Sequence, residues 1–370
     1  MIKEALTEFE IHAQKLKDHY HIPGISLGLN HNGERKYYKG FGFRDVEKAL
    51  PVTGDTVFGI ASITKSFTCV AIMQLQEAGK LSVHDPVLKY LPEFRTPDTK
   101  KTEQMTIHHF MTHTSSLAPL SPAVGPDGES PVTSHEEFMQ FIAETDFKLL
   151  GKPGEHFSYS NHAYNLLGAI IARVSGQDYE TYIYDHILKP IGMINSRFSI
   201  EELGEHDDIT KLYEAKMVRG NTVVYPLPGW GKTPFAKASG QLKSTVNDML
   251  KYADIFRNEG LAGNNRILSS ESIKQMSHPY IEIEPGKYYG YGLMITPDYY
   301  GHTLIEHSGS LDGVASRMCI VPKLGVTGVI LTNLSDIPAG TLLLSALNEA
   351  MDKPVTSTHY KYEDCDIEKS

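Results

Sequence analysis

Apolar and polar positions recur with two different periods along the chain. Near the N-terminus, apolar residues three to four apart predict a helix over residues 2–19, which Pro23 and Gly24 end. Residues 25–30 and 36–43 then have the composition of strands, and the Asn32-Gly33 pair between them is typical of a tight hairpin turn. The first part of the chain therefore predicts one helix followed by two antiparallel strands.

Residues 57–230 have a mainly helical pattern, with loops rich in proline, serine and glycine. Ser134 opens one of the helices with the spacing of a capping box, and Gly176 and Pro190 are expected to end two others. The stretch 114–131 is predicted to be a long loop. The helices predicted in this region cover residues 67–78, 106–112, 134–145, 161–174 and 179–188.

From about residue 290 the period becomes that of strands. Strands are predicted over residues 291–296, 303–307, 314–321 and 326–333, and a closing helix over 340–351. Because strands lie at both ends with helices between them, the pattern predicts an α+β fold. We expect a central antiparallel sheet built from both termini, with an inserted mainly helical domain.

The corresponding domain prediction is one domain over residues 1–352 followed by a polar C-terminal tail over 353–370. Within that domain, a sheet subdomain is expected at about 1–56 and 231–352, and a helical subdomain at about 57–230. Clefts form preferentially where two such regions meet.

Composition narrows the classes of partner. The 370 residues are 41% hydrophobic, which is ample for a large core, and the net charge of −10 disfavours nucleic acid or an anionic membrane as partner. No apolar run approaches the length of a membrane span. The amphipathic, acidic N-terminus lacks the features of a signal peptide, so we expect a cytoplasmic protein, or an exported one whose signal has been removed. Three scattered cysteines form no disulfide framework, and the oligomeric state stays open.

The candidate chemistry lies where the helix over 67–78 is about to begin. Ser62 and Lys65 are three residues apart, so on a helix they share a face and the amine can reach the hydroxyl. Lys65 can take the proton of Ser62 only if it is neutral, which requires desolvation or a nearby cation because a free lysine has a pKa of about 10.4. The pattern alone fits a helix cap beside a solvated lysine equally well.

Two later motifs strengthen the catalytic interpretation of Ser62 and Lys65. Tyr159 and Asn161 stand just before a predicted helix, on a loop of the kind that commonly carries function. His307, Ser308 and Gly309 are expected to end a strand before a tight turn, where glycine permits close approach of backbone or ligand. Each motif alone also fits a packing or capping role.

The order of these motifs resembles that of the penicillin-recognising serine hydrolases. The tyrosine form of the second motif is similar to class C β-lactamases, DD-peptidases, D-aminopeptidases and related esterases. The stretches 107–117, 153–161 and 238–242 carry the same resemblance, which extends from about residue 20 to 350. It implies a hydrolase that needs no cofactor or metal.

The resemblance also implies residue roles. It assigns Ser62 as the acylated nucleophile, while Lys65 and Tyr159 share proton transfer and a buried lysine is expected to favour a tyrosinate. Asn161 would hold Lys65 and the substrate amide, and the backbone N–H groups of Ser62 and Ser310 would form the oxyanion hole. The implied catalytic set is Ser62, Lys65 and Tyr159, and the substrate-binding set is Asn161, His307, Gly309 and Ser310.

The chain departs from the family pattern at three places. His307 stands where many β-lactamases of this type have lysine, so any hold on a substrate carboxylate would depend on pH. Ser116 stands where the family often has glycine, and Arg317 lies on the strand after His307 rather than just before it. Carboxylate recognition is therefore open, which leaves room for an esterase.

The resulting prediction is a serine hydrolase that acts through an acyl-enzyme on a small molecule or short peptide. D-amino-acid peptides are the first substrate class, esters the second and β-lactams the third. The alternatives are a catalytically silent binding protein and a metal site at His109 and His113, which lacks a neighbouring glutamate and a third ligand. Trp230 either lines the cleft mouth or packs in the core.

Overall fold

The computed structural model describes residues 2–118, 132, 134–145, 149–231 and 234–356. Within them, nine strands form one sheet in the order β10-β11-β12-β13-β14-β15-β1-β2-β3, and every neighbouring pair is antiparallel. The N-terminal strand β1 lies beside the C-terminal strand β15, with Ile25 opposite Thr332. The predicted α+β fold with a sheet built from both termini is therefore confirmed. The strands are β1 Gly24–His31, β2 Glu34–Asp45, β3 Leu50–Pro51, β10 Ile281–Glu284, β11 Lys287–Tyr289, β12 Met294–Tyr299, β13 His302–Leu311, β14 Val314–Val321 and β15 Val326–Thr332.

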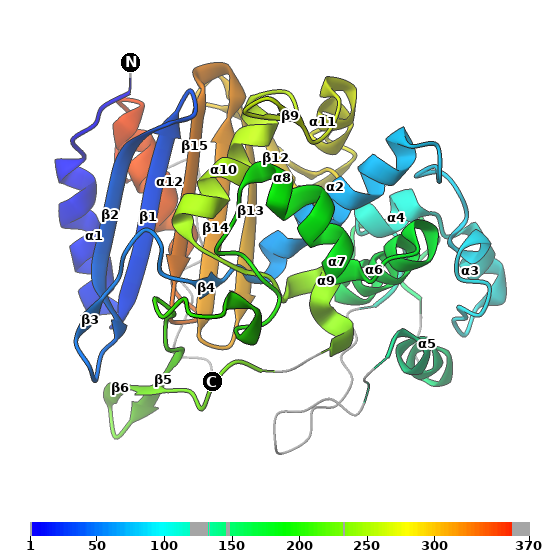
Figure 1. Ribbon diagram of the computed structural model, residues 1–370, viewed down its shortest axis with the longest axis horizontal. Coiled ribbons are helices and arrows are strands. Elements are labelled where there is room, and N and C mark those ends of the chain that lie inside the picture. The colour runs from blue at the N-terminus through cyan, green and yellow to red at the C-terminus, as the bar shows by residue number, and fades with distance from the viewer. Residues whose placement is uncertain (1, 119–131, 133, 146–148, 232–233, 357–370) are drawn as a thin grey trace.

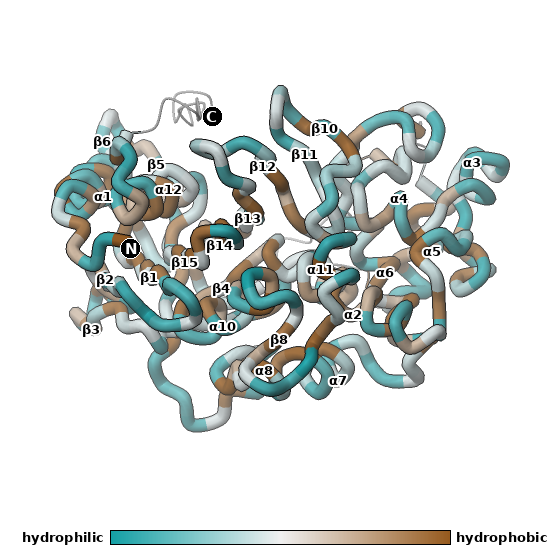
Figure 2. The backbone as a smooth tube through the Cα atoms, turned by 90° about the horizontal axis from the view of Figure 1, so that it is seen from above, coloured by the Kyte–Doolittle hydropathy of each residue, from teal (hydrophilic) through white to brown (hydrophobic). Residues whose placement is uncertain are grey.

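Helices cover both faces of this sheet. α1 (Thr7–His19) and α12 (Ala339–Ala350) lie on one face, and α10 (Val246–Arg257) lies on the other (Figure 1). Successive strand residues alternate between the two cores, as the pleat requires. Cys319 of β14 packs with α12, whereas its neighbour Met318 packs with α10. This explains why β14 and β15 are buried along their whole length; their apolar stretches appear brown in Figure 2.

The remaining helices gather beside the sheet around α2 (Thr64–Glu77). α2 is buried on nearly all sides, so polar residues of its first turns, Thr64, Lys65, Ser66 and Thr68, are buried together with its apolar residues. No helix of the described residues is long and apolar enough to cross a membrane. The other α-helices are α3 Thr99–Gln104, α4 Ile107–Met111, α5 His135–Glu144, α6 Asn161–Ser175, α7 Tyr179–Ile183, α8 Lys189–Ile191, α9 Lys237–Gly240 and α11 Ser270–Met276. Single turns are η1 Ala61–Ile63, η2 Val87–Lys89, η3 Tyr184–Leu188, η4 Glu201–Leu203, η5 Pro234–Ala236 and η6 Pro322–Leu324.

Several predicted ends are confirmed, and one is wrong. The capping box of Ser134 begins α5, and Gly176 ends α6 in the left-handed conformation with φ of 75°. The helix from Tyr179 does not stop at Pro190. It continues through the π-helical turn η3 into α8, which includes Pro190, and it ends at Gly192 with φ of 81°.

The sequence analysis did not predict the helices α10 and α11, and it also missed several short strands. The mainly helical region also holds β4 (Phe58–Gly59), which pairs with β7 (Lys243–Ser244), and the hairpin of β5 (Tyr213–Val218) and β6 (Asn221–Pro226). A further small hairpin joins β8 (Leu261–Ala262) to β9 (Asn265–Arg266). Most of the predicted loop 114–131 and of the tail 353–370 lies outside the described residues, and the subdomain boundaries stay a prediction.

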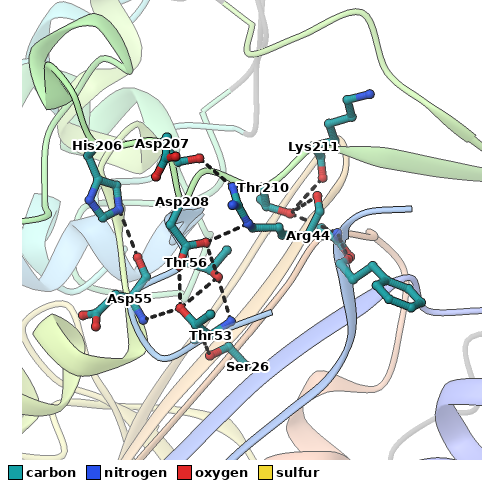
Figure 3. Close-up of polar contacts among 12 residues, drawn as sticks. Ser26, Arg44, Thr53, Asp55, Thr56, His206, Asp207, Asp208, Thr210 and Lys211 are labelled. Carbon is teal, nitrogen blue, oxygen red and sulfur yellow. Dashed lines mark hydrogen bonds and ion pairs between the residues drawn. The ribbon is translucent and has the colours of Figure 1, made fainter. Parts of the chain in front are cut away.

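A polar network fastens the segment that leads into β4 (Figure 3). The carboxylate of Asp208 accepts hydrogen bonds from the hydroxyls of Thr53 and Thr56 and pairs with Arg44 at 3.1 Å. The backbone of Val57 exchanges hydrogen bonds with the same 208–210 segment. The chain entering the Ser62 turn is thus held to the 208–210 segment, between η4 and β5.

A buried ion cluster anchors β13. Glu306 is fully buried, and its carboxylate lies 2.7 Å from the Arg317 guanidinium and 3.3 Å from Lys287 Nζ. Burial opposes the charged carboxylate, but the two cations outweigh it and hold the pKa of Glu306 below its ordinary value. The cluster therefore remains ionised and fixes β13 against β14 and β11.

Removing this carboxylate should destabilise the fold. Glu306→Ala leaves two buried cations without their anion, so we expect the free energy of unfolding to fall by about 3–5 kcal/mol at pH 7. The folded pKa lies below the unfolded value, so the stabilisation is present at neutral pH and is lost as pH falls through the folded pKa. Urea unfolding measures the change, with Glu284→Ala on exposed β10 as control. An equal, small effect of both substitutions would contradict this account.

Candidate active site

Ser62 lies in the single turn η1, which runs directly into α2 at Thr64, so it stands just before a helix start, as the sequence predicted. Ala61 before it has φ of 46°, a left-handed conformation that is rare for a residue with a Cβ. The conformation is held because Ile60 bonds back to Leu242 and its carbonyl accepts the Ser316 hydroxyl at 2.8 Å. Ser62 is thereby presented at a sharp turn and stays partly accessible.

Lys65 is completely buried on the first turn of α2. Its Nζ lies 2.9 Å from Ser62 Oγ and donates to the Ser239 carbonyl at 2.7 Å. No carboxylate of the described residues forms an ion pair with it. Burial therefore lowers the pKa of Lys65 well below its ordinary value, which favours the neutral form that a base needs.

Tyr159 comes from the loop before α6 and places its ring against the amine. Lys65 Nζ is 4.8 Å from the ring centroid of Tyr159 and 5.6 Å from that of Tyr164. Burial raises the pKa of Tyr159 above its ordinary value, although a hydrogen bond to Ser62 acts in the opposite direction. The expected tyrosinate is therefore not favoured, because the neutral lysine supplies no charge to stabilise it. The phenol keeps its proton.

Ser160, and not Asn161, caps the helix α6. Ser160 is the N-cap of α6 and accepts the N–H of Ala163, whereas Asn161 is the first helical residue and is exposed. Among the described contacts, none joins Asn161 to Lys65. The Ser239 carbonyl of α9 occupies that position instead. Asn161 remains near the site only as a candidate for binding substrate.

His307 lies inside β13, which continues to Leu311, and not at a strand end. It is buried, with Nε2 at 2.9 Å from the Tyr289 hydroxyl and Nδ1 at 2.6 Å from the Ser308 carbonyl. A carbonyl only accepts, so the proton sits on Nδ1 and Nε2 accepts from Tyr289. Burial and the nearby Lys65 lower the pKa of His307 to about 3. At neutral pH it is an uncharged ring with both nitrogens engaged.

Gly309 explains why β13 approaches the Ser62 turn so closely. A Cβ at this position would lie 2.3 Å from the Ile60 carbonyl oxygen and 2.9 Å from the Ala61 Cβ. Ser310, the next residue, is exposed at the same end of the strand. The predicted substrate-binding residues of β13 thus lie beside the nucleophile turn.

The arrangement is chemically suited to nucleophilic attack by Ser62. A hydroxyl, a neutral amine and a protonated phenol lie together, which are the groups that acyl transfer requires as nucleophile, base and acid. The structure adds Ser239 and Tyr289, which sequence reasoning did not single out as individual residues. Ser239 lay within the 238–242 stretch of the family resemblance, whereas no sequence signal pointed to Tyr289.

The alternative roles receive less support. The described residues contain no group of histidine, cysteine, aspartate and glutamate side chains placed to hold a metal. His109 uses Nδ1 to accept the Thr106 N–H as part of a helix cap. Trp230 is partly buried against Val314 and the Lys243 ammonium, 5.5 Å from its ring, which describes packing beside β4.

A large antiparallel sheet covered by helices, with a serine at a turn beside a buried lysine, defines a class of protein. This class is the serine hydrolases of β-lactamase and transpeptidase-like fold. Sequence comparison makes the assignment definite. The family model described as Beta-lactamase matches residues 9–347, and the chain belongs to this family.

The chain is also similar to two curated proteins over much of its length. Protein flp of Staphylococcus aureus strain MW2 is 32% identical over 323 residues, which are 85% of this chain and 60% of that protein. An uncharacterised protein of Mycobacterium tuberculosis, MT1414, is 30% identical over 260 residues, covering 64% of this chain and 62% of the other. The chain spans about 60% of the length of the first of these relatives.

Solved structures place the fold in the same group. An octameric penicillin-binding protein homologue from Pyrococcus abyssi superposes with a TM-score of 0.84 and is 36% identical, covering 94% of this chain and 78% of that one. A class C β-lactamase superposes with a TM-score of 0.77 at 20% identity, covering 92% of this chain and 94% of the other. The second similarity concerns the fold alone.

The contact at Gly309 yields a prediction. In Gly309→Ala, the added methyl group should push the Ile60–Ala61 segment away and misplace Ser62, and such a displacement can cost about 10²-fold in rate. The rate of Ser62 labelling by a fluorophosphonate measures the effect. Gly231→Ala is the control, because a Cβ there meets nothing within 4 Å. Labelling at the wild-type rate in Gly309→Ala would show that the close packing does not position the serine.

Proposed function

We propose that the protein hydrolyses amide or ester bonds of small substrates through an acyl-enzyme on Ser62, with D-amino-acid peptides as the first substrate class. The observation that carries the proposal is the distance of 2.9 Å between Ser62 Oγ and the fully buried amine of Lys65. An amine whose pKa is lowered by burial can accept the serine proton at neutral pH. The same pair argues against a catalytically silent binding protein, which has no need of a buried lysine.

In the proposed reaction, Ser62 Oγ attacks the carbonyl carbon as its proton passes to Lys65. The backbone N–H groups of Ser62 and Ser310 stabilise the oxyanion, a contribution of about 3–4 kcal/mol for a typical donor. Tyr159 gives its phenolic proton to the leaving group and regains one from Lys65. Water then attacks the acyl-enzyme by the reverse sequence of proton transfers, and Ser62 is regenerated.

The substrate class is the less constrained part of the proposal. D-amino-acid peptides are favoured by similarity to a penicillin-binding protein homologue at 36% identity. Esters are the second candidate, because His307 is neutral and Arg317 on the next strand is engaged by Glu306, so neither is a cation presented for a substrate carboxylate. β-Lactams rank third. A panel of D-Ala-D-Ala peptides, p-nitrophenyl esters and nitrocefin compares the three classes.

Covalent labelling tests the nucleophile. A fluorophosphonate should add once to the wild-type protein, on Ser62, and Ser62→Ala should lose both the adduct and all turnover while it keeps its melting temperature. Ser82→Ala, in a surface turn, should behave as the wild type. An adduct on another serine, or full activity of Ser62→Ala, would refute the proposed mechanism.

The neutral charge of His307 yields a second prediction, which replaces the expectation of pH-dependent carboxylate binding. With a pKa of about 3, His307 stays neutral from pH 5 to 9 and gains no positive charge as pH falls through 6.5. The ratio of kcat/KM for a D-peptide acid to that for its amide should therefore be constant over this range. A ratio that falls as pH rises through 6.5 would show that a protonated His307 binds the carboxylate after all.

A further inference from the structure

His113 is a buried residue of the 107–117 stretch to which the proposed reaction assigns no role. It follows the short helix α4, and it has φ of 58°, a left-handed conformation that costs energy for a residue with a bulky ring. Its side chain is completely buried. Strained residues persist where the surroundings hold them, so the contacts of His113 indicate what the strain maintains.

The first set of contacts holds the backbone on both sides of Tyr159. The His113 carbonyl accepts the N–H of Ser158 at 2.7 Å, and the His113 Nδ1 accepts the N–H of Ser160 at 3.0 Å. One residue therefore binds the chain immediately before and immediately after Tyr159. The neighbouring Thr114 carbonyl adds a third bond, from the N–H of Gly154 at 2.7 Å.

The second set of contacts is between rings. The imidazole of His113 packs on the phenol ring of Tyr159 with centroids 4.1 Å apart and planes 33° apart. It also contacts the rings of Tyr164 at 4.8 Å and Tyr289 at 4.9 Å. Since Lys65 Nζ lies 4.8 Å from the centroid of the same Tyr159 ring, the phenol is confined by the imidazole as well as by the amine.

These contacts require one protonation state. Because Nδ1 accepts a backbone N–H, the ring proton must sit on Nε2, which is buried with no hydrogen-bond partner among the described residues. Burial and the proximity of Lys65 and His307 hold the pKa of His113 well below its ordinary value. A ring serving only to fill space would not need an acceptor at Nδ1.

From this geometry we infer that His113 is a positioning residue for Tyr159, holding its hydroxyl at the distance from Ser62 and the leaving group that proton transfer requires. The inference rests on the proposed function, in which Tyr159 supplies that proton. His113 itself touches neither Ser62 nor the substrate in this assignment. It acts through the loop and the ring that it holds.

Comparing the hydrolysis of two esters of the same acid distinguishes a positioning role of His113 from a packing role. An ethyl ester expels an alkoxide that must be protonated, whereas a p-nitrophenyl ester expels a stable phenolate that needs no proton. Both give the same acyl-enzyme. In His113→Phe, we expect kcat/KM for the ethyl ester to fall by about 10²-fold more than for the p-nitrophenyl ester. Tyr159→Phe should show the same selective loss, and in the Tyr159→Phe background His113→Phe should cause no further selective loss.

The matched control is His109→Phe. His109 lies in the same stretch and uses the same ring atom to accept a backbone N–H, that of Thr106 at 3.2 Å, but it has no ring contact with Tyr159. It should leave the ratio of the two esters unchanged. If His113→Phe does not fold, His113→Asn serves instead. Asparagine tolerates the left-handed conformation and offers an oxygen to Ser160, so it should retain a smaller selective loss.

The outcomes distinguish failure of the positioning role of His113 from failure of the proposed hydrolytic function. Failure of the wild type to label at Ser62 or to hydrolyse any amide or ester would refute the proposed function. With labelling intact and Tyr159→Phe selectively slow, equal slowing of both esters by the His113 substitutions would overturn the inference. A selective loss that adds in full to that of Tyr159→Phe would overturn it as well, since His113 would then act independently of Tyr159.

Discussion

The neutral amine of Lys65 is the constraint on which the rest of the site depends. A charged ammonium buried without a carboxylate would be very costly, so the side chain gives up its proton instead. The burial comes from the position of Lys65 on α2, a helix enclosed on nearly all sides. Lys65 Nζ donates to the Ser239 carbonyl and lies 2.9 Å from Ser62 Oγ, within reach of the serine proton. The core of the protein thus creates the base.

Burying one side chain in this way requires elements that are distant in sequence to meet. β13 reaches the Ser62 turn because Gly309 has no side chain, and the Glu306 cluster fixes the strand from the other face of the sheet. Alternation along β13 explains how neighbouring residues serve both purposes: Glu306 and His307 point to opposite faces. β13 therefore connects a structural ion cluster on one face of the sheet to the active site on the other.

The sequence predicted the architecture and the main candidates because those depend on local signals. Hydrophobic period, caps and turn pairs located β1, β14, α5 and α6 within a residue or two. The short strands β4 and β7 escaped because two residues show no period. Ser116 illustrates a signal that only the structure explains: its φ of 69° is a conformation that glycine adopts easily, which accounts for glycine at this position in the family. The partners Ser239, Tyr289 and His113 depend on tertiary contacts, so no local pattern could assign them.

The same burial that lowers the pKa of Lys65 also affects the energy of the proposed transition state. His113, His307 and Tyr159 are uncharged at neutral pH, so these described neighbours place no charge beside Ser62 before the reaction. Proton transfer to Lys65 would create a cation and an oxyanion together, in a region where charges interact strongly. The cation would appear 4.8 Å from the ring of Tyr159 and 5.6 Å from that of Tyr164, whose faces attract positive charge. Because these attractions arise only once the charge has formed, they favour the transition state over the ground state, and this difference is what accelerates a reaction.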